Sequence, residues 1–425
     1  QSVSQSVQAL VQLAEMQASK IAIHPSDPKL SPLLGKTFLW FLQRWAPAYI
    51  MPIGAGESGS SIGQPQNTIL QVWSTQESVQ QAVSFCSTLC LHYHCYWPHE
   101  GQVQESSAKL LFSIAKRCKP MRMAMLNSPS FMQLLSLHCL TAGVRHSAPP
   151  QELEDTVRAK LGNISSATNN NNASAIPPVQ MIRGYQRLPY TTKSRILTAL
   201  LVACGDHDEE RSKALVNDCF RALHDSFSSL VDALSTKRAD PDSVDAREMA
   251  CLCAELYVGI ARAGDMEASE RISNFLTPSL PHLSGLMTYY AKDLSICETL
   301  LRLFCDYAEQ FIAVLETKAC IVLFQTSAEL LKSYSSHHCQ ARVVTVTPEH
   351  SADEEQQYSD ILCAIQLLIQ LGAKDFIDVG SGIESSQIAD MIFFGLQQIL
   401  PLMSQGLLQF PTLCSQYFSL VGFVM

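Results

Sequence analysis

The sequence has no run of about 18 or more apolar residues, the length that a membrane-spanning helix requires. It also lacks the G-x-S-x-G, H-E-x-x-H and Walker A patterns, and no other catalytic constellation can be assembled by spacing. We therefore expect no membrane insertion, no enzymatic activity and no cofactor. Charged residues make up only 16% of the chain, and the formal net charge is −9. Such a balance disfavours non-specific nucleic-acid binding and suits basic partners.

The fifteen cysteines form no disulfide or zinc framework, because their number is odd and no two are spaced C-x₂-C. Several lie inside apolar runs, among them Cys204, Cys219 and Cys297. A reduced thiol behaves as a small hydrophobe, and disulfides are rare in the cytosol and nucleus. This usage predicts reduced core cysteines in a chain that works in one of those compartments.

The densest group of possible metal ligands is CSTLCLHYHCYWPHE (86–100). The surrounding segment places core-type residues at steps of four and three: Val79, Val83, Cys86, Cys90, Tyr93 and Trp97. These positions form one stripe of a helix, and one straight helix cannot wrap four ligands around a zinc ion. We predict that Cys86 and Cys90 are buried thiols, that the histidines are partly exposed and that no metal binds. A site completed by a neighbouring helix is the alternative.

Helical periodicity dominates the rest of the chain. One stripe runs Val216, Phe220, Leu223, Phe227, Leu230, Leu234, and another runs Leu294, Cys297, Leu301, Phe304, Ala308, Phe311, Leu315. Ser351 and Glu354 have the spacing of a capping box, and Gly372 is placed to end the helix after it. The one strand-like stretch, ARVVTVT (341–347), lies in a short connector. Helices are expected at about 5–22, 31–47, 67–73, 75–96, 105–117, 128–142, 150–160, 191–204, 208–235, 243–263, 267–275, 279–290, 292–315, 317–335, 352–371, 386–403 and 411–424.

Paired helices that recur at about 40–47 residues are typical of HEAT or armadillo repeats, and this chain has room for about eight or nine. We predict an all-α fold, a HEAT/armadillo-like helical-repeat solenoid in which residues 1–425 form a single array. A compact all-α domain is the alternative. Because the chain lacks an initiator Met and ends on the apolar SLVGFVM, we expect it to be a piece of a longer protein.

Two segments interrupt the helices. Residues 51–66 (MPIGAGESGSSIGQPQ) are rich in glycine and serine, and residues 162–180 (GNISSATNNNNASAIPPVQ) form a polar low-complexity tract. Both are predicted to be flexible loop insertions. The first contains a formal G-x-G-x-x-G, but a helix is expected before it and Pro65 breaks any helix directly after it, so a dinucleotide site is not expected.

Several stretches resemble exportins, nuclear transport receptors of the importin-β superfamily. They are, in the same order along the chain, FLWFLQRW (38–45), ELYVGIARA (255–263), DEEQQYSDIL (353–362), KDFIDV (374–379) and ILPLMSQGLLQFPTLCSQYFSLVGF (399–423). Residues 51–66 and 146–190 depart from the family pattern. The resemblance implies that the chain is a middle-to-C-terminal part of such a receptor.

The resemblance also implies a function that no local motif carries. Exportins bind protein cargo together with RanGTP, pass through the pore by contacting nuclear pore proteins, and release the cargo in the cytoplasm when GTP is hydrolysed. They therefore shuttle between nucleus and cytoplasm. Within the family, the closest likeness is to receptors that carry the hypusine-bearing translation factor 5A and Smad-type proteins. A static HEAT scaffold without a Ran cycle is the competing class, and periodicity does not separate the two.

A hypusine side chain carries two amines, so a receptor for it needs carboxylates held at a fixed separation. Glu248 and Glu255 lie about two turns apart on one expected helix, inside or beside a stretch that resembles the family. We hypothesise that they form a cation-binding patch. An acidic cluster at the preceding turn would steer basic cargo toward it: Asp206, Asp208, Glu209 and Glu210. The alternative is that all six are ordinary solvent-exposed charges on helix surfaces with no role in binding.

Overall fold

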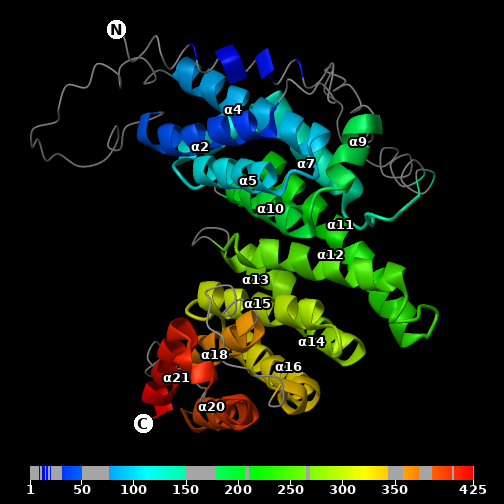
Figure 1. Ribbon diagram of the computed structural model, residues 1–425, viewed down its shortest axis with the longest axis vertical. Helices are drawn as coiled ribbons and strands as arrows, with labels where there is room; N and C mark the ends of the chain where they lie inside the picture. The colour runs from blue at the N-terminus through cyan, green and yellow to red at the C-terminus, as the bar shows by residue number, and fades with distance from the viewer. Residues whose placement is uncertain are drawn as a thin grey trace, which may run out of the picture. The chain divides into compact units, whose positions relative to one another are not determined.

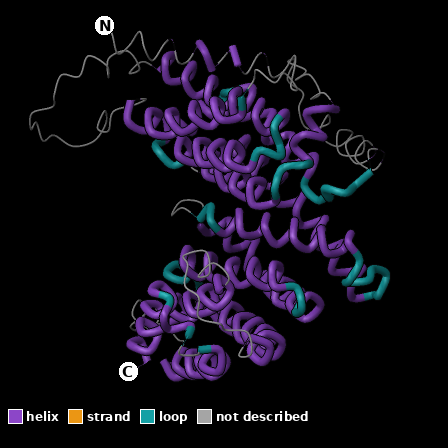
Figure 2. The backbone as a smooth tube through the Cα atoms, viewed as in Figure 1, coloured by secondary structure: helices purple, strands orange, loops and turns teal. Residues whose placement is uncertain are grey.

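The computed structural model describes residues 31–49, 76–149, 179–205, 210–264, 269–342, 358–372, 385–403 and 406–424, with short pieces between 9 and 20 and single residues at 151 and 155. Within these ranges the chain is helical and contains no strand, as the purple tube of Figure 2 shows. The predicted all-α helical-repeat fold is confirmed. None of the helices in the described ranges combines the length and apolar character needed to cross a bilayer.

The chain forms two compact units, Gln1–Leu223 and His224–Met425, and the division falls inside one helix, α11. In the described ranges from residue 31 onward, the first unit contains seven complete helices and the first half of α11 (Glu210–Ser235). They are α2 (Pro32–Tyr49), α4 (Gln76–Tyr96), α5 (Gly101–Ala115), α6 (Lys119–Leu126), α7 (Pro129–Thr141), α9 (Val179–Gln186) and α10 (Tyr190–Gly205). Helix α5 packs between α2 and α10, and this layer is visible in Figure 1.

Helix α4 is the centre of the first unit, because α5, α6, α7 and α9 all pack against it. The predicted stripe is confirmed, and Cys86 and Cys90 have no solvent exposure. Burial raises the pKa of the Cys86 thiol to about 12, which keeps it protonated. The expectation of partly exposed histidines is wrong for His94, which is fully buried. A helix covered by four neighbours buries more than one stripe.

Gln104 of α5 ties the end of α4 in place. Its Nε2 donates to the carbonyl oxygens of Tyr93 at 2.8 Å and Trp97 at 2.6 Å. His94 Nδ1 donates to Gln104 Oε1 at 2.5 Å. Both carbonyl oxygens also accept a backbone N–H group, Tyr93 from Trp97 at 3.0 Å and Trp97 from Glu100 at 3.1 Å, so Gln104 adds a second hydrogen bond to each. The His94 bond fixes the tautomer of that ring and leaves its buried Nε2 with no hydrogen-bond partner in the described residues.

The second unit consists of two layers of stacked helices. One layer holds, in chain order, α12 (Val244–Ala261), α15 (Leu294–Phe311), α18 (Ser359–Gly372) and α21 (Pro411–Val424). The other holds α14 (Leu280–Tyr290), α16 (Thr317–Arg342) and α20 (Ser385–Ile399), with the short α13 (Ser269–Leu276) leading into α14. Short 3₁₀ turns lie between these helices at Thr277–Ser279, Leu400–Leu402 and Leu407–Gln409. Successive helix pairs therefore repeat one packing pattern, which is the arrangement of HEAT-type repeats.

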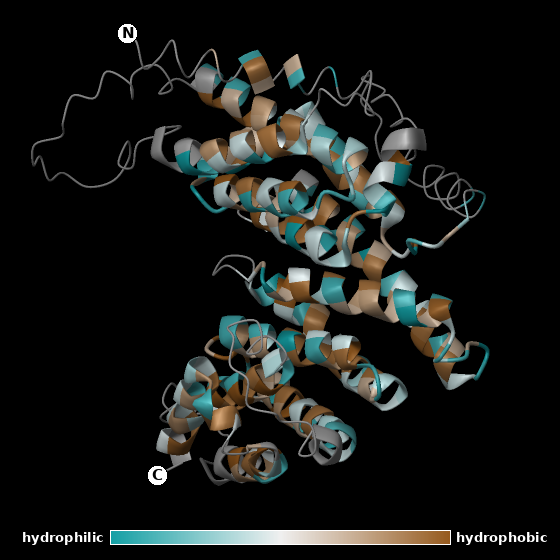
Figure 3. Cartoon of the chain, in the orientation of Figure 1, coloured by the Kyte–Doolittle hydropathy of each residue, from teal (hydrophilic) through white to brown (hydrophobic). Residues whose placement is uncertain are grey.

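The periodic stripes predicted from the sequence face the interior. All six residues of the α11 stripe are buried, and so are all residues of the α15 stripe except Leu294, which is half-buried. Figure 3 shows apolar and polar residues alternating along the helices in this way. Helix α15 also buries Ile296, Leu300 and Leu303, because both α12 and α18 cover it.

Some predicted features lie wholly or partly outside the described residues. These are the loop at 51–66, the helix at 67–73, most of the helix at 150–160 and the capping box at 351–354. Of the predicted loop at 162–180, the last two residues belong to α9, and the rest lies outside. Residues 341–342 of the strand-like stretch are helical, at the end of α16. The helix that ends at Gly372 is confirmed.

We predict that Gly184→Ala strongly destabilises the first unit. A Cβ atom on Gly184 of α9 would lie 1.8 Å from the carbonyl oxygen of Cys95 in α4. The clash is with a backbone atom, so no side chain can rotate away to relieve it. We expect a loss of at least about 2 kcal/mol in unfolding free energy, measured by chemical denaturation. Gly101→Ala is the matched control in the same unit, because its Cβ meets nothing within 4 Å. Equal effects of the two substitutions would refute this packing.

We also predict that His94 makes stability depend on pH. Burial lowers its pKa from 6.5 to about 4, although the hydrogen bond to Gln104 opposes this. Between those pH values the unfolded chain binds a proton that the folded chain does not, so the unfolding free energy falls as the pH falls. The loss approaches about 3 kcal/mol at pH 4.

His94→Gln should remove this part of the pH profile, whereas His99→Gln at an exposed site should keep it. An NMR titration of His94 in the unsubstituted protein reads the same pKa directly. A value near 6.5 would contradict the prediction.

Candidate functional site: paired charges between α12 and α15

The structure describes three of the six acids predicted to contact cargo. Glu248 and Glu255 lie on α12, where Glu248 is half-buried and Glu255 is 8% exposed. Glu210 is the first residue of α11, and its exposed carboxylate lies 3.8 Å from Lys213 Nζ. Asp206, Asp208 and Glu209 lie outside the described residues. The hypothesis of a cation-binding patch therefore depends first on the surroundings of α12.

Glu255 already has a cation beside it. Its Oε1 accepts a hydrogen bond from Arg302 Nη2 at 2.5 Å and another from Thr299 Oγ1 at 3.4 Å, both on α15. A buried carboxylate needs such a partner, since an uncompensated charge in the interior is costly. A cationic cargo side chain would have to compete with Arg302 for this carboxylate.

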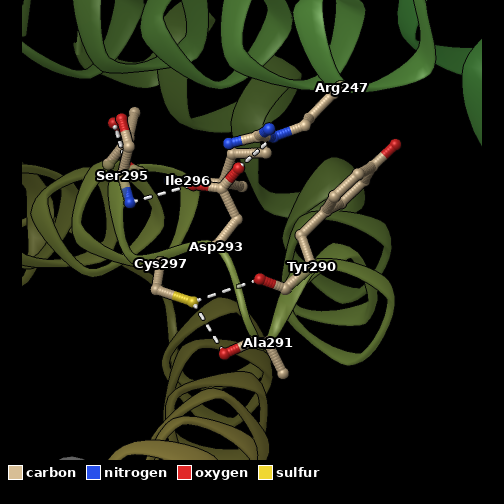
Figure 4. Close-up of polar contacts among 8 residues, drawn as sticks. Arg247, Tyr290, Ala291, Asp293, Ser295, Ile296 and Cys297 are labelled. Atoms are coloured by element: carbon tan, nitrogen blue, oxygen red, sulfur yellow. Dashed lines mark hydrogen bonds and ion pairs between the residues drawn. The ribbon is translucent and has the colours of Figure 1, made fainter. Parts of the chain in front are cut away.

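Two further ion pairs join the same helices, or their ends. Arg262, directly after α12, donates from Nε to Asp306 Oδ2 at 2.7 Å. Arg247 Nε donates to Asp293 Oδ2, as Figure 4 shows. The three pairs join residues 46, 44 and 47 positions apart, which matches the repeat length expected from the sequence. A search for opposite charges at this separation would have found them.

Asp293 makes two kinds of interaction at the start of α15, an N-cap and an ion pair. Its Oδ1 accepts from the backbone N–H groups of Ser295 at 3.1 Å and Ile296 at 3.4 Å, which is an N-cap. Its Oδ2 accepts from Arg247. In the same turn the Cys297 thiol donates to the carbonyls of Tyr290 at 3.4 Å and Ala291 at 3.7 Å (Figure 4). One side chain thus fixes both where α15 begins and how α12 lies against it.

In all three pairs the carboxylate is the more buried partner. The side-chain exposures are 11% for Asp293, 15% for Asp306 and 11% for Glu255. Those of the arginines are 58% for Arg247, 38% for Arg262 and 25% for Arg302. Burial raises the pKa of Asp306, and the charge of Arg262 opposes that shift. Arg247 and Arg262 are therefore the solvent-exposed partners of their pairs, whereas Arg302 is largely covered and its Nε is buried.

Other chemical possibilities are weaker in the described ranges. No group of three or more Cys, His, Asp or Glu side chains is placed there to hold a metal ion. Desolvation raises the pKa of Cys251 to about 11, so this thiol on α12 is a poor nucleophile. A shallow hollow of about 450 Å³ is lined by His224, Asp225, Ser228, Ser229, Asp232, Ala233 and Arg238. These residues come from α11 and the turn after it, so the hollow lies along a single helix.

We predict that Glu255 and Arg302 are energetically coupled. Removing either partner leaves the other charge poorly solvated, whereas removing both relieves it. A double-mutant cycle with Glu255→Gln and Arg302→Met should give a coupling of about 1–3 kcal/mol in unfolding free energy. The control cycle uses Glu210 and Lys213, a pair in which the Glu210 side chain is 94% exposed and no measurable coupling is expected. Additive effects at Glu255 and Arg302 would disprove the coupling.

A comparison of the chain with models of known protein families finds no match. The exportin likeness therefore rests on the quoted stretches of sequence, and its functional consequences are proposals.

Proposed function

We propose that this chain is part of a nuclear export receptor of the exportin-4 type, which binds protein cargo together with RanGTP. The likeness of residues 399–423 and of the four shorter stretches, in the same order along the chain, supports it. The single structural observation that favours it is the stacking of helix pairs in the second unit, because receptors of this superfamily are built from such repeats. On this proposal the protein shuttles between nucleus and cytoplasm and contacts nuclear pore proteins.

The repeat architecture is physically suited to this task. Each helix pair packs mainly on its neighbours, so a stacked array can flex without losing its core and can present a long binding surface. The net charge of −9 suits basic cargo, with the hypusine-bearing factor 5A and Smad-type proteins as the proposed partners. Glu248 and the cluster at 206–210 stay the proposed cargo contacts. Glu255 can contribute only if cargo displaces Arg302 or shares the carboxylate with it.

The second candidate is a static scaffold that holds protein complexes without a Ran cycle. The three ion pairs between α12 and α15 favour it, because each ties neighbouring repeats in one register. A flexing receptor and a rigid scaffold share all the helical features. They differ in whether the bound guanine nucleotide of Ran changes what the protein holds.

We predict that cargo binding depends on RanGTP. The bait is the complete receptor of which this chain is expected to be a part, immobilised and exposed to cell extract. Ran is added either with a non-hydrolysable GTP analogue or with GDP. We expect a defined set of proteins, including the hypusinated factor 5A, to be retained at least about tenfold better with the GTP form, a coupling of about 1.4 kcal/mol or more. Retention of the same proteins to the same extent in both arms would instead identify a scaffold.

A further inference from the structure

Two thiols of the first unit point at each other. Cys139 lies near the end of α7 and Cys219 in the first half of α11, and their Sγ atoms are 3.7 Å apart. Cys139 is 8% exposed and Cys219 is 2% exposed. Other buried thiols donate to backbone carbonyls, as Cys90 does to Ser107 and Cys320 does to Leu315, both at 3.6 Å. Cys139 and Cys219 contact each other through their sulfurs, which places two thiols close enough to be joined by oxidation.

We propose that Cys139 and Cys219 are an oxidisable dithiol that a hydroperoxide converts to a disulfide between α7 and α11. A disulfide bond is about 2.05 Å long, so the sulfurs must approach by less than about 2 Å from their present 3.7 Å. The two residues are 80 positions apart in the chain, so the bond would join elements that the sequence does not keep together.

The surroundings assign different roles to the two sulfurs. The hydrogen bond with Cys139, and then burial, hold the pKa of Cys219 well above its ordinary value, so Cys219 keeps its proton. The two sulfurs share one hydrogen bond, in which either thiol can donate, and Cys139 is the more exposed of the two, so we assign Cys139 as the sulfur that the oxidant reaches first.

The reaction needs two steps. The Cys139 thiolate attacks one oxygen of hydrogen peroxide, the O–O bond breaks, and a sulfenic acid and hydroxide form, the latter taking up a proton to become water. Cys219 sulfur then attacks the sulfenic sulfur, the S–O bond breaks, and the departing hydroxide leaves as water with the Cys219 proton. Both thiols are oxidised by one electron each, and one peroxide is reduced to two molecules of water. A small neutral oxidant suits a thiol with so little exposure.

The crosslink has a mechanical consequence. It fastens the first half of α11 to α7, and it closes a chain segment of about 80 residues, which restricts the unfolded state. The oxidised first unit should therefore unfold at a temperature about 5–15 °C higher than the reduced one.

The test treats the full 425-residue chain with graded hydrogen peroxide, alkylates the remaining thiols and maps disulfide-linked peptides by mass spectrometry. We expect one dominant crosslink, Cys139 to Cys219, accompanied by the rise in melting temperature and reversed by dithiothreitol. Cys139→Ser and Cys219→Ser should each abolish the crosslink and the shift. Cys414→Ser, at a half-buried thiol of α21, should abolish neither.

Three outcomes would overturn the proposal. One is a crosslink between Cys219 and Cys204, the other thiol close enough to influence the pKa of Cys219. The second is oxidation of Cys139 to sulfinic acid. The third is no reaction at Cys139 while Cys414 oxidises. Because peptide mapping of the unsubstituted protein decides between these outcomes, the result does not depend on whether either serine variant folds.

Discussion

The second unit depends on the packing of α15 against α12 on one side and α18 on the other. A helix covered on two flanks, with a second layer behind it, must be apolar beyond one stripe, and Ile296, Leu300 and Leu303, which lie outside the stripe, are all fully buried. Apolar contacts of this kind are strong but tolerate sliding, because they have little directionality. The position of α15 along α12 is set by Asp293, which caps α15 and accepts a hydrogen bond from Arg247 of α12. The ion pairs Arg262–Asp306 and Arg302–Glu255 join the same two helices and hold them in the same relative position.

In each of these ion pairs the carboxylate is more buried than the arginine, and this affects the charge that the surface presents to a partner. A carboxylate beneath a guanidinium group contributes to cohesion between helices and little to the field felt by an approaching partner. An acidic chain can thus have a local face on which arginines are outermost. The proposed transport function is compatible with that arrangement if cargo is attracted by other acids, such as Glu248 or the cluster at 206–210.

Cysteine serves three purposes in this protein, and its position in the fold decides which. Cys86 fills the core around α4 as a small apolar group. Cys297 donates to two carbonyls beside the cap of α15 and completes a turn. Cys139 and Cys219 contact each other, so that each thiol has a second sulfur as its hydrogen-bond partner. Composition alone treats all three kinds as equivalent.

Most of the helices in the described residues follow from the sequence, because the period of an apolar stripe and the position of an end such as Gly372 are local properties of the chain. The prediction missed α6 and α9, which are both only eight residues long. Repeat spacing was local enough to predict the fold class as well. Tertiary structure alone decided the rest. His94 is buried because four helices pack against α4. Glu255 forms an ion pair because Arg302 lies on the next helix of the layer. Cys139 contacts Cys219 although 80 positions separate them in the chain. Each of these depends on which distant segment supplies the contact, and a helical period contains no information about that.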